Sequence, residues 1–247
     1  ADNISLGSMT VSESGDFSLL LSRERPDGYR GDWLQLEDDI HMVMVRQYFH
    51  DRAGAREARV AIRALEQASY QPPQDGLLAQ RLDRATAFFN DTFSGNLALM
   101  EMVQKNANSF DTPKEYNAEF GGVFYPTHDN LYFGTWVELA EDEAVIVEGV
   151  APDVDYWSIS LQNQWMQTYD YRYHPVTLNN RDIAVGDDGR YQVVISAENP
   201  GVENWLSTAG LNRGLLAIRY QLAQESEPPQ MRVVKVSDLA LQRGPGR

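Results

Sequence analysis

Residues 9–22 read MTVSESGDFSLLLS and residues 183–196 read IAVGDDGRYQVVIS, so the two stretches align without a gap. Both carry a glycine, Gly15 or Gly189, at the end of a short polar segment between two apolar runs. Glycine readily adopts the positive φ that tight hairpin turns require. The run after each glycine is rich in the aromatic, β-branched and aliphatic residues typical of strands. The chain therefore contains the same predicted hairpin twice.

The similarity between the two copies continues, with small gaps, as far as residues 60 and 233. Each copy predicts a hairpin, a loop closed by a Trp-Leu pair, a third strand and a short fourth strand. In the first copy the third strand would span residues 41–49, which are apolar on both faces as in a central strand. We expect Trp33 and Trp205 to be core residues, because they recur at the same place in the repeat. The duplication predicts that both copies have the same strand arrangement.

The chain between the two copies has a different pattern. After a break at Pro72-Pro73, apolar residues recur at helical spacing: Leu77, Leu78, Leu82, Ala85, Phe88 and Phe89. This spacing predicts a helix of about 15 to 20 residues with Asp75 as its N-cap. A second, shorter helix is predicted over residues 96–108. A polar, glycine-containing stretch then leads back to strands predicted at residues 131–139, 144–150 and 156–161.

These elements predict a mainly β fold, a β-sandwich or jelly-roll-like arrangement with an inserted helical segment and an internal duplication of a β unit. The expected divisions are residues 1–66 for the partial first copy, 67–129 for the helical insertion and loop, and 130–247 for a sandwich domain that contains the second copy. One continuous structural domain is the alternative.

The first copy lacks the strands that precede the second copy in residues 131–182. Exposed sheet edges and apolar faces are avoided in native proteins. We therefore expect the first copy to be completed by strands of the second copy, by a neighbouring subunit in a homo-oligomer, or by an N-terminal segment of a longer precursor.

Several segments together carry a family resemblance: Asn130-Leu131-Tyr132, EAVIVEG at residues 143–149, YWSISL at 156–161, Asp188-Gly189 and NPGVENWL at 199–206. They resemble the bacterial family called domain of unknown function 1214, over most of the C-terminal half, and the first copy is similar to a partial second version. The resemblance implies a β-sandwich or jelly-roll fold and no settled activity. Family members tend to carry histidine and aspartate near three positions where this chain has Asn180, Asn199 and Leu211, which puts any site built on such groups in doubt.

Composition excludes several classes of function. The chain has 36 acidic and 21 basic residues and a formal net charge of -15, so its mean field repels phosphate backbones and anionic lipid surfaces. No nucleic-acid or membrane partner is expected, and no apolar run reaches the roughly 18 residues of a membrane span. Cysteine is absent, which excludes thiolate nucleophiles and thiolate metal sites. The four histidines lack metal-ligand spacing, and no cofactor motif occurs, so neither a metal nor a cofactor is expected.

Residues 156–174 are the best candidate for a functional stretch, because aromatic, amide and charged side chains are concentrated there. Flat rings beside polar groups suit a small polar or carbohydrate-like ligand. In this hypothesis Trp165, Tyr169 and Arg172 bind the ligand in a cavity bordered by residues 165–174. Aromatic packing along an ordinary pair of strands would account for much of the same pattern.

Two other functions fit the same stretch. In the first, the protein is an enzyme of hydrolase or lyase type, with Asp170 and His174 as acid and base and Tyr171 assisting. In the second, it is a structural or assembly subunit whose aromatic residues lie in a protein interface. An enclosed cleft around Asp170 and His174 would favour the enzyme, an open aromatic shelf would favour ligand binding, and a patch covered by another chain would favour assembly.

Overall fold

The computed structural model describes residues 3–38, 40, 42–65, 72, 74–111, 130–223 and 225–241. The chain divides by its contacts into two compact units, residues 1–48 and 49–247. The boundaries predicted near residues 66 and 129 fall on residues outside the described set. Among the described residues, no helix combines the length and hydropathy needed to cross a bilayer.

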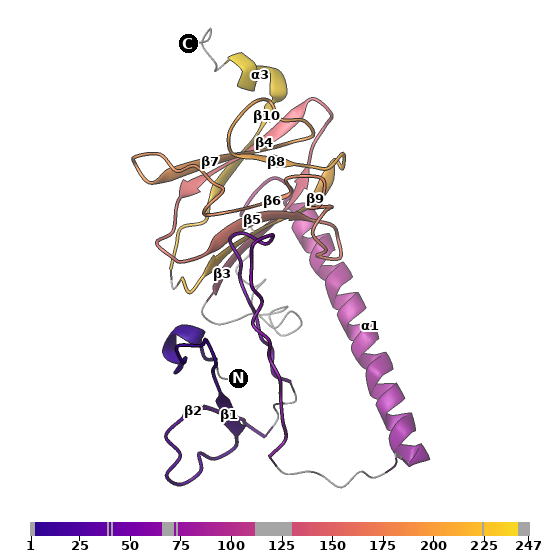
Figure 1. Cartoon of the computed structure of the whole chain (residues 1–247). Coiled ribbons are helices and arrows are strands. Elements are labelled where there is room, and N and C mark those ends of the chain that lie inside the picture. The colour runs from indigo at the N-terminus through magenta and orange to yellow at the C-terminus, as the bar shows by residue number, and fades with distance from the viewer. Residues whose placement is uncertain are drawn as a thin grey trace. The chain divides into compact units, whose positions relative to one another are not determined.

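In the second unit, eight strands of the described chain form two four-stranded sheets (Figure 1). One sheet has the strand order β3-β9-β5-β6 and the other has the order β10-β4-β7-β8. The strands are β3 (Asn130–Glu138), β4 (Glu143–Val150), β5 (Trp157–Gln162), β6 (Thr177–Asn179), β7 (Arg190–Ser196), β8 (Trp205–Ser207), β9 (Arg213–Gln221) and β10 (Gln230–Lys235).

The core of the second unit lies between these two sheets. Side chains alternate along a strand, so every second residue of β5 is buried: Trp157, Ile159 and Leu161. They belong to the same apolar cluster as Val193 and Ile195 of the facing sheet. The unit is therefore a β-sandwich, as the sequence predicted.

Helices cover part of the outer face of each sheet. Near the C-terminal end of α1 (Asp75–Lys105), Leu99 and Val103 pack on Trp136 of β3 and Leu215 of β9. On the other sheet, Leu239 of α3 (Val236–Leu241) packs against Ala144, Ile146 and Val194. The prediction of two successive helices between the copies is wrong, because α1 is continuous over 31 residues. Residues 90–96 are mostly polar, and the helix continues through them because Leu99 and Val103 beyond them pack on the sandwich.

The first unit contains a short 3₁₀ helix, η1 (Leu6–Ser8), and a pair of parallel strands, β1 (Leu19–Ser22) and β2 (Asp32–Gln35). Their register matches that of β7 and β8. Leu20 pairs with Trp33, and Val194 pairs with Trp205. Leu20 and Val194 are aligned positions of the two sequence copies, and so are the two tryptophans.

The same hydrogen bonds also recur in the two copies. Trp33 Nε1 donates to Ser22 Oγ at 2.8 Å, and that hydroxyl donates to the Glu24 carbonyl oxygen at 2.7 Å. Trp205 Nε1 donates to Ser196 Oγ at 2.9 Å, and Ser196 donates to the Glu198 carbonyl oxygen at 2.7 Å. A duplicated unit would produce this correspondence.

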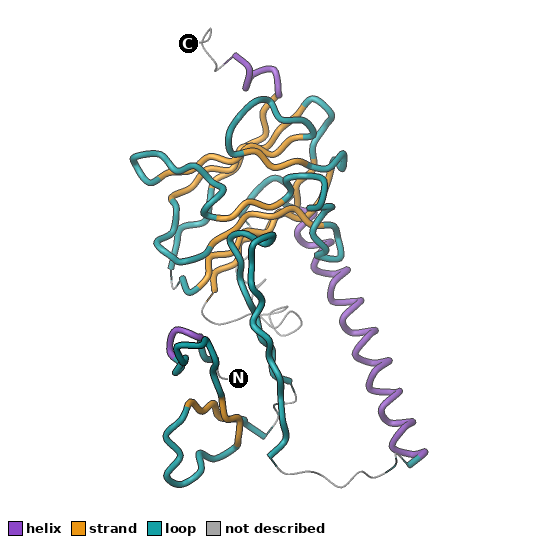
Figure 2. Tube along the Cα trace, in the orientation of Figure 1, coloured by secondary structure: helices purple, strands orange, loops and turns teal. Residues whose placement is uncertain are grey.

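The first copy differs from the second beyond this pair of strands. Residues 42–49 are not assigned to a strand, and Met42 to Val45 are exposed, so the predicted central strand is absent from this part of the described chain. Figure 2 shows that most of the described residues between 3 and 65 are loop. Both tryptophans are partly buried and neither belongs to the fully buried core, so the prediction that they are core residues holds only in part.

Candidate functional site

The connection between β5 and β6 begins with a turn that Asn163 holds in place. Its side-chain Oδ1 accepts hydrogen bonds from the backbone N–H groups of Trp165 and Gln167, at 2.8 and 3.1 Å. Met166 adopts a φ of 60° within this turn. Such asparagine-centred turns present the residues at their tip to the surroundings. Trp165 is accordingly partly exposed, and its ring stacks on Phe93 of α1 at a centroid distance of 5.3 Å.

Tyr169, the next candidate residue, is buried in the sandwich core. Its hydroxyl donates a hydrogen bond to the Arg213 carbonyl oxygen at 2.6 Å. Gly214 leaves room for that hydroxyl, since a Cβ atom at this position would overlap it. Burial raises the pKa of Tyr169 to about 12. The residue anchors the loop from inside the sandwich and presents no surface to a ligand.

A second turn follows immediately and exposes two tyrosine rings. The carbonyl oxygen of Asp170 accepts hydrogen bonds from the backbone N–H groups of Tyr173 and His174, at 3.3 and 3.1 Å. Within this turn Tyr171 is 53% exposed and Tyr173 is 78% exposed. Exposed rings of this size are available for stacking with a ligand.

The charged side chains of this turn interact with each other. Arg172 Nε and Nη2 donate to the two carboxylate oxygens of Asp170, at 2.9 and 3.2 Å. These hydrogen bonds, with a smaller contribution from the charge of His174, hold the pKa of Asp170 below its usual value. The Arg172 guanidinium also lies over the Tyr173 ring, with Cζ 5.6 Å from the ring centroid.

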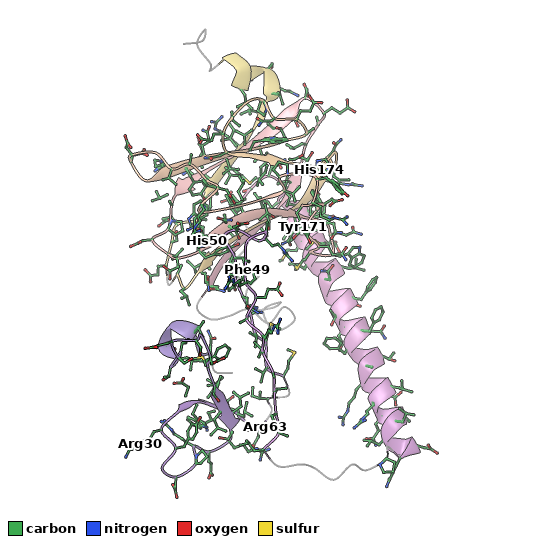
Figure 3. The ribbon with its side chains drawn as sticks, viewed as in Figure 1. Arg30, Phe49, His50, Arg63, Tyr171 and His174 are labelled. Carbon is green, nitrogen blue, oxygen red and sulfur yellow. The ribbon has the colours of Figure 1, made fainter. Side chains whose placement is uncertain are left out.

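A distant part of the chain reaches the same turn. Arg52 places its Cζ 5.2 Å from the centroid of the Tyr171 ring. The backbone near Arg52 is attached to the sandwich, because His50 accepts a hydrogen bond from Asn179 Nδ2 through its carbonyl oxygen at 2.8 Å. His50 Nε2 lies 3.0 Å from the Asp155 carbonyl oxygen, and Figure 3 shows His50, Tyr171 and His174 in this region of the sandwich.

We call Tyr171, Tyr173, Arg52 and Arg172 the aromatic shelf. It combines two exposed rings with two guanidinium groups, one above each ring. Cation–π pairs of this kind hold the rings in a defined orientation. Arg52 was not identified from the sequence, because it lies more than a hundred residues away along the chain and no local pattern connects it with the tyrosines.

Beside residues 165–174, the described part of the chain has a narrow gap at Tyr169. Tyr169 lines a gap with Val137, Leu161 and residues 211–214, and this gap does not hold even a water molecule. A larger cavity of about 350 Å³ lies elsewhere, between residues 150–154 on one side and Leu222, Ala223, Glu225 and Ser226 on the other. A ligand of the aromatic shelf would therefore bind on an open surface.

Comparisons with known proteins identify relatives of unknown function. A family model described as "Protein of unknown function (DUF1254)" matches residues 107–240. The match confirms an uncharacterised bacterial family, and the specific resemblance to domain of unknown function 1214 is not confirmed. A search of curated proteins found no match.

Two solved structures are similar to the chain. An uncharacterised protein from Burkholderia cenocepacia matches with a TM-score of 0.79 and 26% identity, over 94% of this chain and 63% of its own. The chain thus spans less than two thirds of that relative's length. A protein from Vibrio parahaemolyticus matches with a TM-score of 0.38 and 18% identity, over 68% of this chain and 47% of its own. So low a score does not establish a shared fold.

Proposed function

Since this chain belongs to the DUF1254 family, which is described as being of unknown function, we propose a function from the site itself. In this proposal the protein binds a small, polar, sugar-like ligand on the aromatic shelf. The observation that carries this proposal is that each of the two exposed tyrosine rings of this turn has a guanidinium group over it. Arg172 of the same turn lies over Tyr173, and Arg52 lies over Tyr171. Other tyrosines of the sandwich, such as Tyr191 and Tyr220, are buried.

The chemistry of these groups defines the ligand. The C–H face of a sugar ring stacks on a flat aromatic ring, which contributes apolar contact without requiring an enclosed pocket. A guanidinium group recognises a carboxylate through two parallel hydrogen bonds. Arg172 already forms such a pair with Asp170, so Arg52 is the group assigned to the ligand. The proposed ligand is therefore a sugar acid rather than a neutral sugar.

A titration with glucuronic acid and glucose tests this proposal. The two probes share a ring and differ in the carboxylate, so glucuronic acid should bind the wild-type protein and glucose should bind much more weakly. Tyr171→Ala should abolish detectable glucuronic acid binding, and Arg52→Met should reduce the preference for the acid. Arg190→Met, a change in an exposed residue of the opposite sheet, serves as the control and should leave binding intact.

Three results would contradict the proposal: equal binding of both sugars, binding that survives Tyr171→Ala, or no binding of either probe at millimolar concentration. Isothermal titration calorimetry provides the readout. Each variant is checked by thermal unfolding, so that loss of binding is not confused with loss of the fold.

The enzyme hypothesis uses the same turn and has one observation in its favour. Asp170 and His174 belong to one turn, in which the His174 backbone N–H donates to the Asp170 carbonyl oxygen at 3.1 Å. If the protein is a hydrolase or lyase, Asp170→Asn and His174→Gln abolish turnover of a sugar-acid substrate while binding persists. If it only binds the ligand, the wild-type protein leaves the probe chemically unchanged, as measured by NMR of the probe.

A further inference from the structure

Helix α1 is covered over only part of its length. At its C-terminal end, Asn96, Leu99, Met100 and Val103 are buried against the sandwich. Over residues 77–93, by contrast, six large apolar residues are between 43% and 66% exposed: Leu77, Leu78, Leu82, Phe88, Phe89 and Phe93. Figure 1 shows this half of the helix extending away from the two sheets.

The exposed and the buried apolar residues form one continuous stripe. With about 100° of rotation per residue, all of them fall within a single arc of roughly 160° on the helix surface. The opposite side carries exposed polar residues that include Asp83, Asn90, Asp91 and Glu101. The helix therefore has one mainly apolar face, which also carries Arg81. The sandwich covers its C-terminal part, and Phe93 at the border stacks on Trp165. We call the exposed part, residues 77–93, the α1 stripe.

The spacing along this face is that of a helix pair. Apolar or small residues alternate at intervals of four and three through Leu78, Leu82, Ala85, Phe89, Thr92, Asn96, Leu99 and Val103. A seven-residue repeat of this kind keeps the same seam facing a partner helix over its whole length. The C-terminal end of this face already packs on a sheet, and the spacing of the remainder also fits a second helix.

Asn96 adds an independent observation at the border of the covered part. The residue is 8% exposed, and its side-chain Oδ1 has no hydrogen-bond partner in the described part of the chain. A buried acceptor without a partner costs about 1 to 3 kcal/mol. Because Asn96 is already covered within one chain, it lies outside the α1 stripe and marks the residue at which the stripe ends.

The area of the α1 stripe suits a dimer. If a fully exposed leucine or phenylalanine presents about 200 Å², the six residues expose roughly 650 Å², and pairing two copies would bury on the order of 1,300 Å². Stable interfaces bury about 1,200 to 2,000 Å² in total. The exposed stretch is about 25 Å long, which gives two helices several turns over which to pair.

We propose that two copies of this chain pair through their α1 stripes, in antiparallel orientation. Antiparallel pairing places the two sandwiches at opposite ends of the helix pair, which separates two chains that each carry a formal charge of -15. It also sets the helix dipoles in opposite directions. The two-fold axis then crosses the helices at the level of residues 85–87. This inference does not depend on the aromatic shelf having a ligand.

Sedimentation equilibrium of the full chain at micromolar concentration tests the pairing. The expected mass is that of a dimer, and added salt should strengthen association by screening the like charges. Leu82→Asp should raise the dimer dissociation constant by about a hundredfold or more, because a charge enters the centre of the interface. Ala87→Asp adds the same charge on the opposite side of the helix and should leave the dimer intact.

Cross-linking gives a second readout that needs no disruptive substitution. The chain contains no cysteine, so Ala85→Cys and Ala87→Cys each create a single reactive site at nearly the same height on the helix. A short bis-maleimide reagent should link two copies through position 85 and not through position 87. Monomeric mass at all concentrations, or equal cross-linking at both positions, would overturn the proposal. Monomeric mass would point instead to a segment like those that the Burkholderia relative has outside the matched region.

Discussion

Asn179 connects parts of the chain that are far apart in sequence. Its buried side chain donates to the His50 carbonyl oxygen at 2.8 Å and accepts a hydrogen bond from the backbone N–H of Arg181, also at 2.8 Å. The first bond holds the segment that carries Arg52 against the sandwich. The amide stabilises the fold through both its Nδ2 and its Oδ1 atom, because removing it leaves two hydrogen-bond partners unsatisfied.

We expect Asn179→Ala to lower the free energy of unfolding by about 1 to 3 kcal/mol. Asn180→Ala is the comparison, since the neighbouring Asn180 side chain is only partly buried and its two hydrogen bonds are longer: it donates to the Asp155 carbonyl oxygen at 3.2 Å and accepts from the Trp157 N–H at 3.4 Å. Its effect should stay below about 1 kcal/mol. Urea unfolding measures both values. Equal effects of the two substitutions would show that the attachment of residues 49–56 does not depend on Asn179.

Tyr169 should make the stability of the fold depend on alkaline pH. Its pKa is raised by burial from the ordinary value of 10.0 to about 12 in the folded protein. The unfolded chain therefore releases the proton at lower pH than the folded chain does. The associated stability is fully present below pH 10 and is lost as pH rises from about 10 to about 12.

Tyr169→Phe should reduce the decline of stability over this pH range, as measured by urea unfolding at several pH values. The decline should not disappear, because burial also raises the pKa of Tyr191 and of Tyr220. An unchanged slope in the variant would mean that the Tyr169 hydroxyl ionises at the same pH in both states.

The candidate residues show how far sequence reasoning extends at this scale. The concentration of aromatic and charged side chains between Trp165 and His174 is visible in the sequence and does form two adjacent turns. The sequence does not show which of these rings face outward. Tyr169 is buried and Tyr171 is exposed, because the chain turns between them at Asp170. The partners Arg52 and Phe93 come from remote segments and follow only from the tertiary structure.

At the scale of elements, α1 is the clearest departure from the sequence prediction. The start near Asp75 and the helical spacing were predicted, whereas the break before residue 96 is absent. Asn90, Gly95 and Asn96 each have low helix propensity. Leu99 and Val103 pack on the sandwich and stabilise the last turns, so tertiary contact outweighs the local preference.

Leu99→Ala and Leu82→Ala separate the covered and exposed parts of this helix. Leu99 is fully buried, so its truncation should lower the stability of each subunit by about 2 to 5 kcal/mol. Leu82 is exposed in the single chain, so its truncation should change subunit stability by less than about 1 kcal/mol and should weaken dimerisation instead. Thermal unfolding at low and high protein concentration distinguishes the two effects. A large loss for Leu82→Ala at low concentration would mean that its side chain is already covered within one chain.

At the scale of the whole molecule, the mainly β fold could be predicted because strand patterning is local. The recurring register of β1 with β2 and of β7 with β8 follows the sequence repeat. The number of strands that join each copy in a sheet could not be predicted, since it depends on pairing between strands that are far apart in the sequence. Two sheets form around the second copy, whereas the described residues of the first copy hold only the pair β1 and β2.

A crystal structure of the protein soaked with glucuronic acid tests the proposed function most directly. The proposal predicts a sugar ring stacked on Tyr171 or Tyr173, with its carboxylate within hydrogen-bond distance of Arg52. A sugar bound instead in the 350 Å³ cavity beside Asp153 and Glu225, or an empty aromatic shelf at saturating concentration, would contradict it.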